Sequence, residues 1–372
     1  MPDSLFAGSE SCRRCHQSIY DSFKTTAHSL TSVPAEAKYV KGNFDDKKNR
    51  FVYNKFMEVL LEKKNNSFFQ TAYINGVSLQ SEPFDVVVGS GRKGQTYLYW
   101  KDDQLLQLPV SYYTPTHSWC NSPGYPLSLI RFDRVIPANC MECHGSYAKF
   151  DDANNTTYFD KNSIIYGVNC ERCHGPAAKH VKFHLENPKE KIANFILTKK
   201  NLSRQQSLDV CALCHGGVRQ SVRPPFSFAA GDKLTDFSMP TYTDDSASLL
   251  DVHGNQYGLL TASKCFKQSQ MNCASCHNVH KEEINVPKLY SSRCMNCHND
   301  ASHNMCTLPE TPGFVLSDNC IDCHMPSLPS KKIFLQSSDP DKSSPDFVRT
   351  HLVAIYPEIT KLVLEKKAKP VK

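Results

Sequence analysis

The sequence contains no long hydrophobic run. Of its 372 residues, 40% are hydrophobic, and the longest apolar stretches, such as 84–88, are bounded by polar residues or glycine. A membrane-spanning helix needs roughly 18 or more consecutive apolar residues, so we expect no integral membrane segment. Residues 1–10 also lack the basic start and apolar core of an export signal. We therefore expect the numbering to follow a processed or recombinant form.

Tryptophan is scarce and neither sign of charge dominates. There are 2 Trp, but 16 Tyr and 20 Phe are spread along the chain, and 43 Lys and Arg stand against 37 Asp and Glu, giving a formal charge of +6. Disordered chains have few aromatic residues, so we expect a folded protein. The length alone suggests two to three domains.

Cysteine and histidine are abundant, with 17 and 15 residues. Fourteen of the cysteines fall into one pattern, Cys-x-x-Cys-His, which occurs seven times. The segments are Cys12, Cys15 and His16; Cys140, Cys143 and His144; Cys170, Cys173 and His174; Cys211, Cys214 and His215; Cys273, Cys276 and His277; Cys294, Cys297 and His298; and Cys320, Cys323 and His324. Chance placement at this composition gives far fewer than one such segment.

This pattern is the attachment signature of haem c. The two thiols form thioethers with the two haem vinyl groups, and the following histidine supplies the proximal iron ligand. Zinc half-sites or disulfides are the alternative, but zinc sites would leave some Cys-x-x-Cys pairs without a following histidine. The sequence therefore predicts seven covalently attached haems. Attachment of this kind takes place outside the cytoplasm, so we expect a periplasmic or extracellular protein.

Seven haems in this length leave about 53 residues for each, too few to give every haem its own domain. We expect a mainly α fold with much irregular loop, built around closely packed haems, with a small antiparallel β insert. Each ferric haem with its two propionates adds a charge of about −1, so the basic excess balances propionates and does not indicate nucleic-acid binding.

Eight histidines remain as possible distal ligands, one more than seven irons require. The candidates are His28, His180, His184, His253, His280, His303 and His351, with His117 as the weakest. His180 and His184 have the i, i+4 spacing that places both on one helical face. His280 follows His277 too closely to bind the same iron, so we expect it to reach a neighbouring haem. Either His117 or His184 is the spare histidine.

Four segments organise the chain. Residues 1–44 carry the first haem, 45–112 form a β-rich insert without haem, 113–325 form a six-haem core, and 326–372 comprise a Pro/Ser linker and a C-terminal helix packing back on the core. The insert contains Gly-x-Gly-x-x-Gly at Gly89, Gly91 and Gly94. Dinucleotide binding would require a helix after this loop, but strand-forming residues follow, so we predict a hairpin turn.

Three cysteines lie outside the haem segments: Cys120, Cys265 and Cys306. An odd count leaves at least one thiol unpaired in an oxidising compartment. Cys265 and Cys306 bracket the fifth and sixth haem segments, so we expect a disulfide between them. Cys120 is expected to be a buried, inert thiol rather than a reactive one.

The opening segment, GSESCRRCHQSIYDSFKTTAH, resembles that of the cytochrome c-554/hydroxylamine oxidoreductase-like superfamily. CERCHGPAAKHV, DVHGNQYGLL and CASCHNVH, and CIDCHMP with a later histidine, also resemble the ligand segments of that group. The resemblance implies stacked and perpendicular haem pairs and distal roles for His28, His180, His253, His280 and His351. It does not explain the β insert.

Two departures from that superfamily bear on function. Its nitrite reductases replace one proximal histidine by lysine, whereas all seven segments here end in histidine. Its hydroxylamine oxidoreductase carries eight haems and a tyrosine crosslinked to the catalytic haem, and no tyrosine here can be assigned that role. Fold alone does not separate the carriers of the group from its enzymes.

Three functions remain open. The first is electron transfer through mostly bis-histidine haems to redox partner proteins or extracellular acceptors. The second is an enzyme with one open haem acting on nitrite, hydroxylamine or a similar molecule, with Tyr112, Tyr113 and His117 as neighbouring candidates. The third is a subunit of a homo-oligomer or extracellular filament, formed by a contact that does not close. We expect the electron carrier, in which no side chain performs acid–base catalysis.

Overall fold

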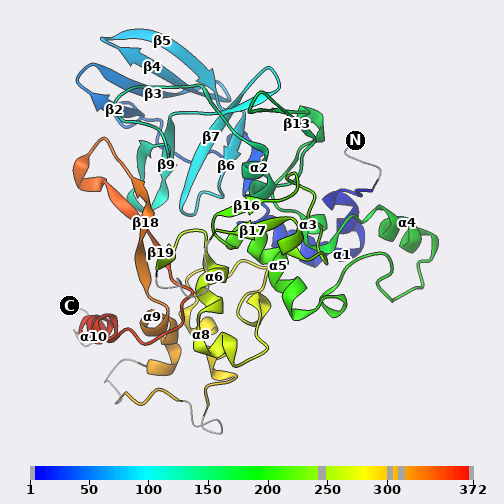
Figure 1. The fold of residues 1–372 in the computed structure, drawn as a ribbon. Coiled ribbons are helices and arrows are strands. Elements are labelled where there is room, and N and C mark those ends of the chain that lie inside the picture. The colour runs from blue at the N-terminus through cyan, green and yellow to red at the C-terminus, as the bar shows by residue number, and fades with distance from the viewer. Residues whose placement is uncertain (1–4, 242–248, 300–304, 309–314, 368–372) are drawn as a thin grey trace. The chain divides into compact units, whose positions relative to one another are not determined.

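The computed structural model describes residues 5–241, 249–299, 305–308 and 315–367 (Figure 1). Helices account for 30% of residues and strands for 27%. The expected mainly α fold is therefore wrong. The sequence predicts strands only within 45–112, whereas short strand pairs also form among the Cys-x-x-Cys-His segments, where each strand is too short to give an alternating pattern.

The helices are short. They are α1 (Ser9–Lys24), α2 (Ala138–His144), α3 (Cys170–His174), α4 (Ala178–Glu186), α5 (Arg204–His215), α6 (Gln256–Thr261), α7 (Lys264–Lys267), α8 (Pro287–Met295), α9 (Cys320–His324) and α10 (Pro357–Lys367).

The strands concentrate in the first half of the chain. They are β1 (Ser32–Pro34), β2 (Arg50–Asn54), β3 (Met57–Lys64), β4 (Ser67–Ile74), β5 (Val77–Pro83), β6 (Val86–Val88), β7 (Gly94–Lys101), β8 (Gln104–Gln107), β9 (Val110–Tyr113), β10 (Ser118–Asn121), β11 (Arg134–Val135), β12 (Gly145–Tyr147), β13 (Phe150–Ala153), β14 (Thr156–Phe159), β15 (Ile165–Tyr166), β16 (Arg219–Ser221), β17 (Ser238–Pro240), β18 (Ser327–Leu335) and β19 (Ser344–Arg349).

The chain forms two compact units. Unit 1 comprises Met1–Asn201, Arg223–Ala230 and Ile333–Pro345, and unit 2 comprises Leu202–Val222, Gly231–Lys332 and Asp346–Lys372. Unit 1 holds three Cys-x-x-Cys-His segments and unit 2 holds four. The division into four segments expected from the sequence stays a prediction.

Two antiparallel sheets form most of unit 1. One has the order β2-β3-β4-β5, and the other has the order β1-β6-β7-β8-β11 with β9 paired to β7 and β10. Asn75 and Gly76 connect β4 to β5 with φ angles of 52° and 76°, as a tight hairpin turn requires. Strands β2 to β8 lie within 45–112, which the sequence predicts to be a β-rich insert.

The main hydrophobic cluster of unit 1 joins side chains from both sheets. Phe51, Val59 and Leu61 from the first sheet pack with Tyr97 and Leu106 from the second. All five are less than 5% exposed, so the strands have their own core. Each such residue stabilises the fold by about 1.5–3 kcal/mol through burial.

The glycine-rich loop connects β6 to β7, and a strand rather than a helix follows it. Gly89 and Gly91 have φ angles of 101° and 80°. A Cβ on Gly89 would lie 2.6 Å from the Gly94 carbonyl oxygen, so the turn requires glycine there. The prediction of a hairpin turn is confirmed.

The C-terminal region differs from the expected linker. Residues 327–349 contain β18 and β19, which pair with each other, and α10 follows. Proline and serine suggested an irregular segment, but Ile333 and Leu335 alternate with polar or less buried neighbours, and Leu335 packs against Cys120 and Tyr113. This pairing could not be deduced from composition.

Candidate haem-binding sites

Most Cys-x-x-Cys-His segments lie on a helix or at its end. Five of the segments occupy α1, α2, α3, α5 and α9. Of the other two, the segment at Cys273 begins in the 3₁₀ turn Cys273–Ser275, and the segment at Cys294 begins at the end of α8. Two cysteines three residues apart share one side of a helical turn. Local structure thus presents both thiols of a segment together, with the histidine beside them.

The attachment segments contact each other in three pairs. In each pair, the thiol of the first cysteine of one segment contacts the thiol of the first cysteine of the other. The pairs are Cys12 with Cys170, Cys211 with Cys273, and Cys294 with Cys320. The thiol hydrogen bonds lower the pKa of Cys170 and of Cys320 to about 6 in the chain before haem attachment. Six of the seven attachment segments are therefore adjacent in pairs, and Cys140 begins the remaining one.

Nδ1 of seven imidazoles is within hydrogen-bond distance of a protein oxygen. The contacts are His174 to Leu197 O (2.7 Å), His180 to Asn194 O (2.7 Å), His215 to Gln256 Oε1 (3.2 Å), His253 to Asp346 Oδ2 (3.0 Å), His277 to Tyr290 Oη (3.5 Å), His324 to Ala354 O (2.9 Å) and His351 to Arg349 O (3.3 Å). Metal-binding histidines are held in this way, because the partner at one ring nitrogen orients the other. This arrangement leaves Nε2 of each ring available to a metal ion.

His277 and His351 are related as two ligands of one iron would be. Their ring centroids lie 6.1 Å apart and their planes are inclined by 23°. Two imidazoles that share an iron have centres roughly 6 Å apart, because each metal–nitrogen bond is about 2 Å long. Burial lowers the pKa of His351 to about 4, which favours the neutral imidazole that coordinates metal.

His28 and His144 are positioned by a buried cluster of polar groups in unit 1, which we call the serine junction (Ser32, Ser146 and Gly167). The Ser32 hydroxyl donates to the His144 carbonyl (2.5 Å), and the Ser146 hydroxyl donates to the Gly167 carbonyl (2.7 Å). Val168 N donates to the His28 carbonyl (2.9 Å). Three segments distant in sequence are thereby fixed next to two histidines.

The other non-segment histidines of unit 1 lie on α4 and between β9 and β10. His180 and His184 are on one face of α4, with ring centroids 4.6 Å apart, so the predicted shared face is confirmed. Nε2 of His184 is buried without a hydrogen-bond partner. His117 is exposed and has a left-handed backbone, with φ 49°.

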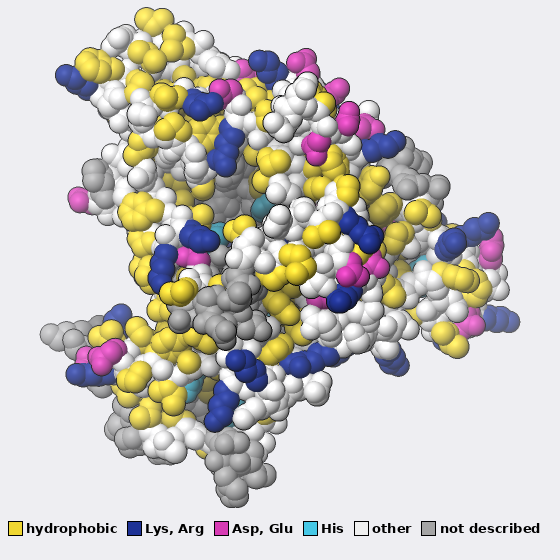
Figure 2. Space-filling view, in the orientation of Figure 1, with side chains coloured by type: hydrophobic (Ala, Val, Ile, Leu, Met, Phe, Trp, Pro, Cys, Tyr) yellow, Lys and Arg dark blue, Asp and Glu magenta, His cyan; other side chains and the backbone are white. Residues whose placement is uncertain are grey.

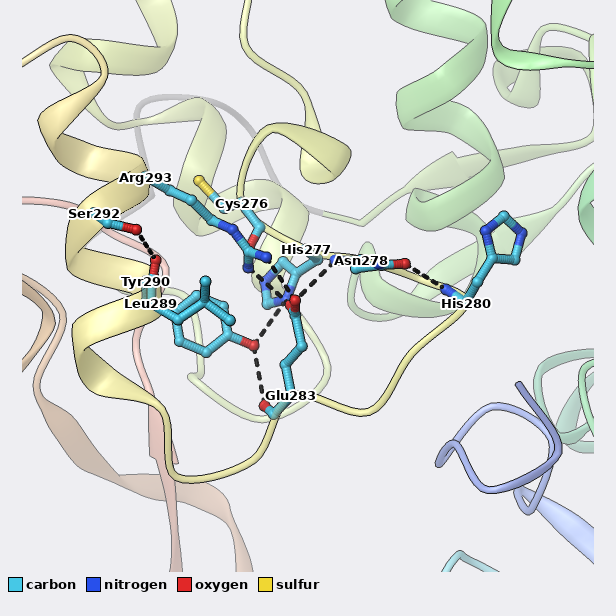
Figure 3. A network of polar contacts seen from close by, with 9 residues as sticks. All are labelled: Cys276, His277, Asn278, His280, Glu283, Leu289, Tyr290, Ser292 and Arg293. Atoms are coloured by element: carbon cyan, nitrogen blue, oxygen red, sulfur yellow. Dashed lines mark hydrogen bonds and ion pairs between the residues drawn. The ribbon is translucent and has the colours of Figure 1, made fainter. Parts of the chain in front are cut away.

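An ion pair links the fifth haem segment to α8, which carries the start of the sixth (Figure 3). Arg293 donates to both carboxylate oxygens of Glu283, and Glu283 accepts from Asn278 N (3.2 Å). The Arg293 guanidinium also donates to the Cys276 carbonyl. The His280 ring points away from His277 in Figure 3, in keeping with a role for His280 at another iron.

Sequence reasoning missed Asp346, Glu283, Arg293 and the serine junction. Asp346 and the Ser32 hydroxyl of the junction contact residues remote in sequence, and no motif signals the pairing of Glu283 with Arg293. His303 lies outside the described residues.

The three other cysteines do not pair. Cys265 and Cys306 are free thiols, so the expected disulfide is wrong. Cys265 instead lies near Cys297, and Cys306 near Cys323. Cys120 is 2% exposed in β10, and burial raises the pKa of its thiol to about 12. It is therefore a protonated, inert residue.

Two helices near attachment segments, α4 and α8, bury little of their own surface. No residue of α4 is fully buried, and Ser291 is the buried residue of α8. Leu249 and Ile355 are 75% and 79% exposed, and Figure 2 shows hydrophobic side chains over much of the visible surface. An apolar group of porphyrin size suits such surroundings. Together with the oriented imidazoles and the attachment thiols, most of which are at least partly exposed, these features fit haem c.

Comparisons with known proteins agree with this fit. Residues 131–175 match the family model for cytochrome c554 and c-prime. The multiheme cytochrome MtrA of Shewanella baltica (strain OS185) is 23% identical over 195 residues, covering 50% of this chain and 52% of the relative. The chain thus spans about half the length of that curated relative.

A solved structure resembles the fold of nearly the whole chain. The crystal structure of the outer cell wall cytochrome OcwA gives a TM-score of 0.59 at 17% identity, over 96% of this chain and 81% of that one. Among the described residues, no helix has the length and apolar character needed to cross a membrane. The attachment segments, the oriented imidazoles and these likenesses identify the chain as a multihaem c-type cytochrome, with haem c bound covalently.

Proposed function

We propose that the protein is a heptahaem electron carrier that works in the periplasm or outside the cell. Its seven Cys-x-x-Cys-His segments would hold seven haems, and most irons would have two histidine ligands. Haem iron supplies one-electron transfer between its ferric and ferrous states. The observation that carries the proposal is the contact between attachment segments in three pairs, since adjacent redox centres are what a carrier requires.

The distal ligands proposed are His28, His180, His184, His253, His280, His303 and His351. In unit 1, three segments accompany His28, His117, His180 and His184, and in unit 2, four segments accompany the other four. The supply of histidine within each unit is thus sufficient for every iron. The spacing of His277 and His351 supports one such pair directly.

The protein's own residues keep the imidazoles in place as charge passes. Backbone carbonyls of Leu197, Asn194 and Ala354 hold Nδ1 of His174, His180 and His324. Preformed contacts of this kind reduce the reorganisation that accompanies a change of charge. No catalytic side chain is needed for this role. The partners proposed are redox proteins or extracellular acceptors.

Stopped-flow reoxidation tests the proposal. The fully reduced protein is mixed anaerobically with a ferric chelate while haem absorbance is recorded. In a parallel assay it is supplied with excess reduced methyl viologen as electron donor and with nitrite or hydroxylamine, whose consumption is measured. We expect complete reoxidation by the ferric chelate and no multiple-turnover consumption of nitrite or hydroxylamine. Sustained turnover of either molecule, or reduced haems that the chelate cannot oxidise, would contradict a carrier function.

A further inference from the structure

We infer that Asp346 is a positioning residue that lowers the reduction potential of the haem ligated by His253. The inference rests on the proposed role of His253 as an iron ligand and deepens the proposed electron-transfer function. Asp346 lies on β19, and its Oδ2 is 3.0 Å from Nδ1 of His253.

The acceptor at His253 differs chemically from the others. His174, His180, His324 and His351 contact backbone carbonyls, His215 contacts an amide oxygen and His277 contacts a tyrosine hydroxyl. Of the seven Nδ1 contacts described above, the one at His253 is made to a carboxylate. Carboxylates form stronger, charge-assisted hydrogen bonds and make a ligating imidazole more basic.

Burial increases the influence of this carboxylate. The Asp346 side chain is 5% exposed, whereas that of His253 is 47% exposed. The imidazole therefore contacts a buried carboxylate through Nδ1, while the rest of its ring is partly accessible to solvent. A charge in low-dielectric surroundings acts more strongly on a nearby ion than one in water.

A second carboxylate fixes the backbone around the same histidine. Asp251 Oδ1 accepts from His253 N (2.8 Å) and from the Ser330 hydroxyl (2.8 Å), and Oδ2 accepts from Lys331 N (2.5 Å). Asp251 thereby ties the His253 loop to β18, the strand that pairs with β19. The loop is held independently of Asp346, so removing the charge of Asp346 should leave His253 in place.

The direction of the effect follows from charge. An anionic partner at Nδ1 strengthens electron donation by the imidazole and favours ferric over ferrous iron. The haem bound by His253 should therefore be reduced at a lower potential than the same haem with a neutral partner. In a reductive titration, this haem would be reduced after an otherwise matched haem whose histidine has a neutral partner.

Asp346→Asn tests the inference in the full haem-loaded protein. Spectropotentiometric titration should show one haem with at least a tenfold more favourable reduction equilibrium, equivalent to about 59 mV for a one-electron couple. EPR spectroscopy should show that all signals remain low-spin, because His253 stays bound. Asp346→Glu keeps the charge and should remain near the wild-type potential.

Asp318→Asn is the matched control. Asp318 belongs to the same unit and pairs with Lys288 at 3.1 Å, so this variant removes one negative charge without removing an imidazole contact. If Asp346→Asn shifts no haem further than Asp318→Asn does, the inference is wrong.

His253→Ala separates this inference from the proposed function. A new high-spin ferric signal is expected, because one iron loses its distal ligand. If every haem remains low-spin, His253 is not a ligand and the role of Asp346 falls, while reoxidation by the ferric chelate still stands as the test of electron transfer.

Discussion

A histidine that binds iron must have its ring oriented before the metal–nitrogen bond has a defined direction. The Cys-x-x-Cys-His pattern reveals each proximal histidine because attachment depends on adjacent residues. It does not reveal the Nδ1 partner, since Ala354 lies 30 residues beyond His324 and Leu197 lies 23 beyond His174. Proximal ligands are therefore predictable from the sequence, and their orientation is not.

The spacing of His277 and His351 gives a residue-level prediction. His351→Ala should convert one low-spin ferric haem to high-spin, because His351 faces the proximal ligand His277 across 6.1 Å. Low-temperature EPR with spin integration would measure the change. Retention of the full low-spin intensity in a correctly loaded protein would show that His351 does not ligate that iron.

The spare histidine of unit 1 is predicted to be His117. It is exposed and has a φ of 49°, whereas His184 has a buried Nε2 without a hydrogen-bond partner. His117→Asn should leave the haem spectrum unchanged, since asparagine tolerates the left-handed conformation. His184→Ala should produce a high-spin signal. The reverse pattern in EPR spectra would assign His184 as the spare.

At the scale of the structural elements, the serine junction requires two backbone segments, at Gly167 and Ser29, to lie close together. A Cβ on Gly167, where φ is 71°, would lie 2.2 Å from the Ser29 carbonyl oxygen. Gly167→Ala should destabilise the protein by more than the roughly 1–3 kcal/mol that a left-handed alanine alone costs. Thermal unfolding followed by circular dichroism measures the loss.

Gly76→Ala is the control for that substitution. Gly76 has a φ of 76° with no atom within 4 Å of its Cβ position, so it carries the same conformational cost without the clash. Equal melting temperatures of the two variants would contradict the proposed close approach.

Because Glu283 and Arg293 form an ion pair, we expect the packing of α8 to become less stable in acid. The Arg293 hydrogen bonds hold the pKa of Glu283 below its usual 4.5. Its stabilising contribution is therefore present above 4.5 and is lost as pH falls through the lower folded-state value. Glu283→Gln should reduce stability at pH 6 and flatten the decline below pH 4.5, measured by denaturant unfolding. An unchanged acid profile would exclude this role.

Strands and helices were not equally predictable. β3 and β4 have eight residues each and are rich enough in apolar residues to be recognised, and β6 and β7 flank a glycine-rich turn. β12, β15, β16 and β17 contain two or three residues each, and their pairing depends on contacts between remote segments. The mainly α expectation was wrong because such strands leave no pattern in the sequence.

At the scale of the whole molecule, the sheets of unit 1 and the helix α8 of unit 2 differ in how much of their own surface they bury. The sheets of unit 1 have a hydrophobic cluster that includes Phe51, Tyr97 and Trp119, whereas α8 of unit 2 buries little of its own. Haem attachment should therefore matter more for the region of α8 than for these sheets. In chain produced without haem attachment, limited proteolysis should degrade 286–299 before 50–120, and mass spectrometry would identify the fragments. Equal protection of both regions would contradict this difference.

The central claim is that seven haems are attached and that their irons have two protein ligands. The most direct test combines the haem content per chain, from the pyridine haemochrome assay and protein concentration, with spin-integrated EPR of the oxidised protein. We predict seven haems per chain and low-spin signals alone, after allowance for spin-coupled pairs. Fewer than seven haems, or a high-spin ferric signal approaching one equivalent, would contradict the account.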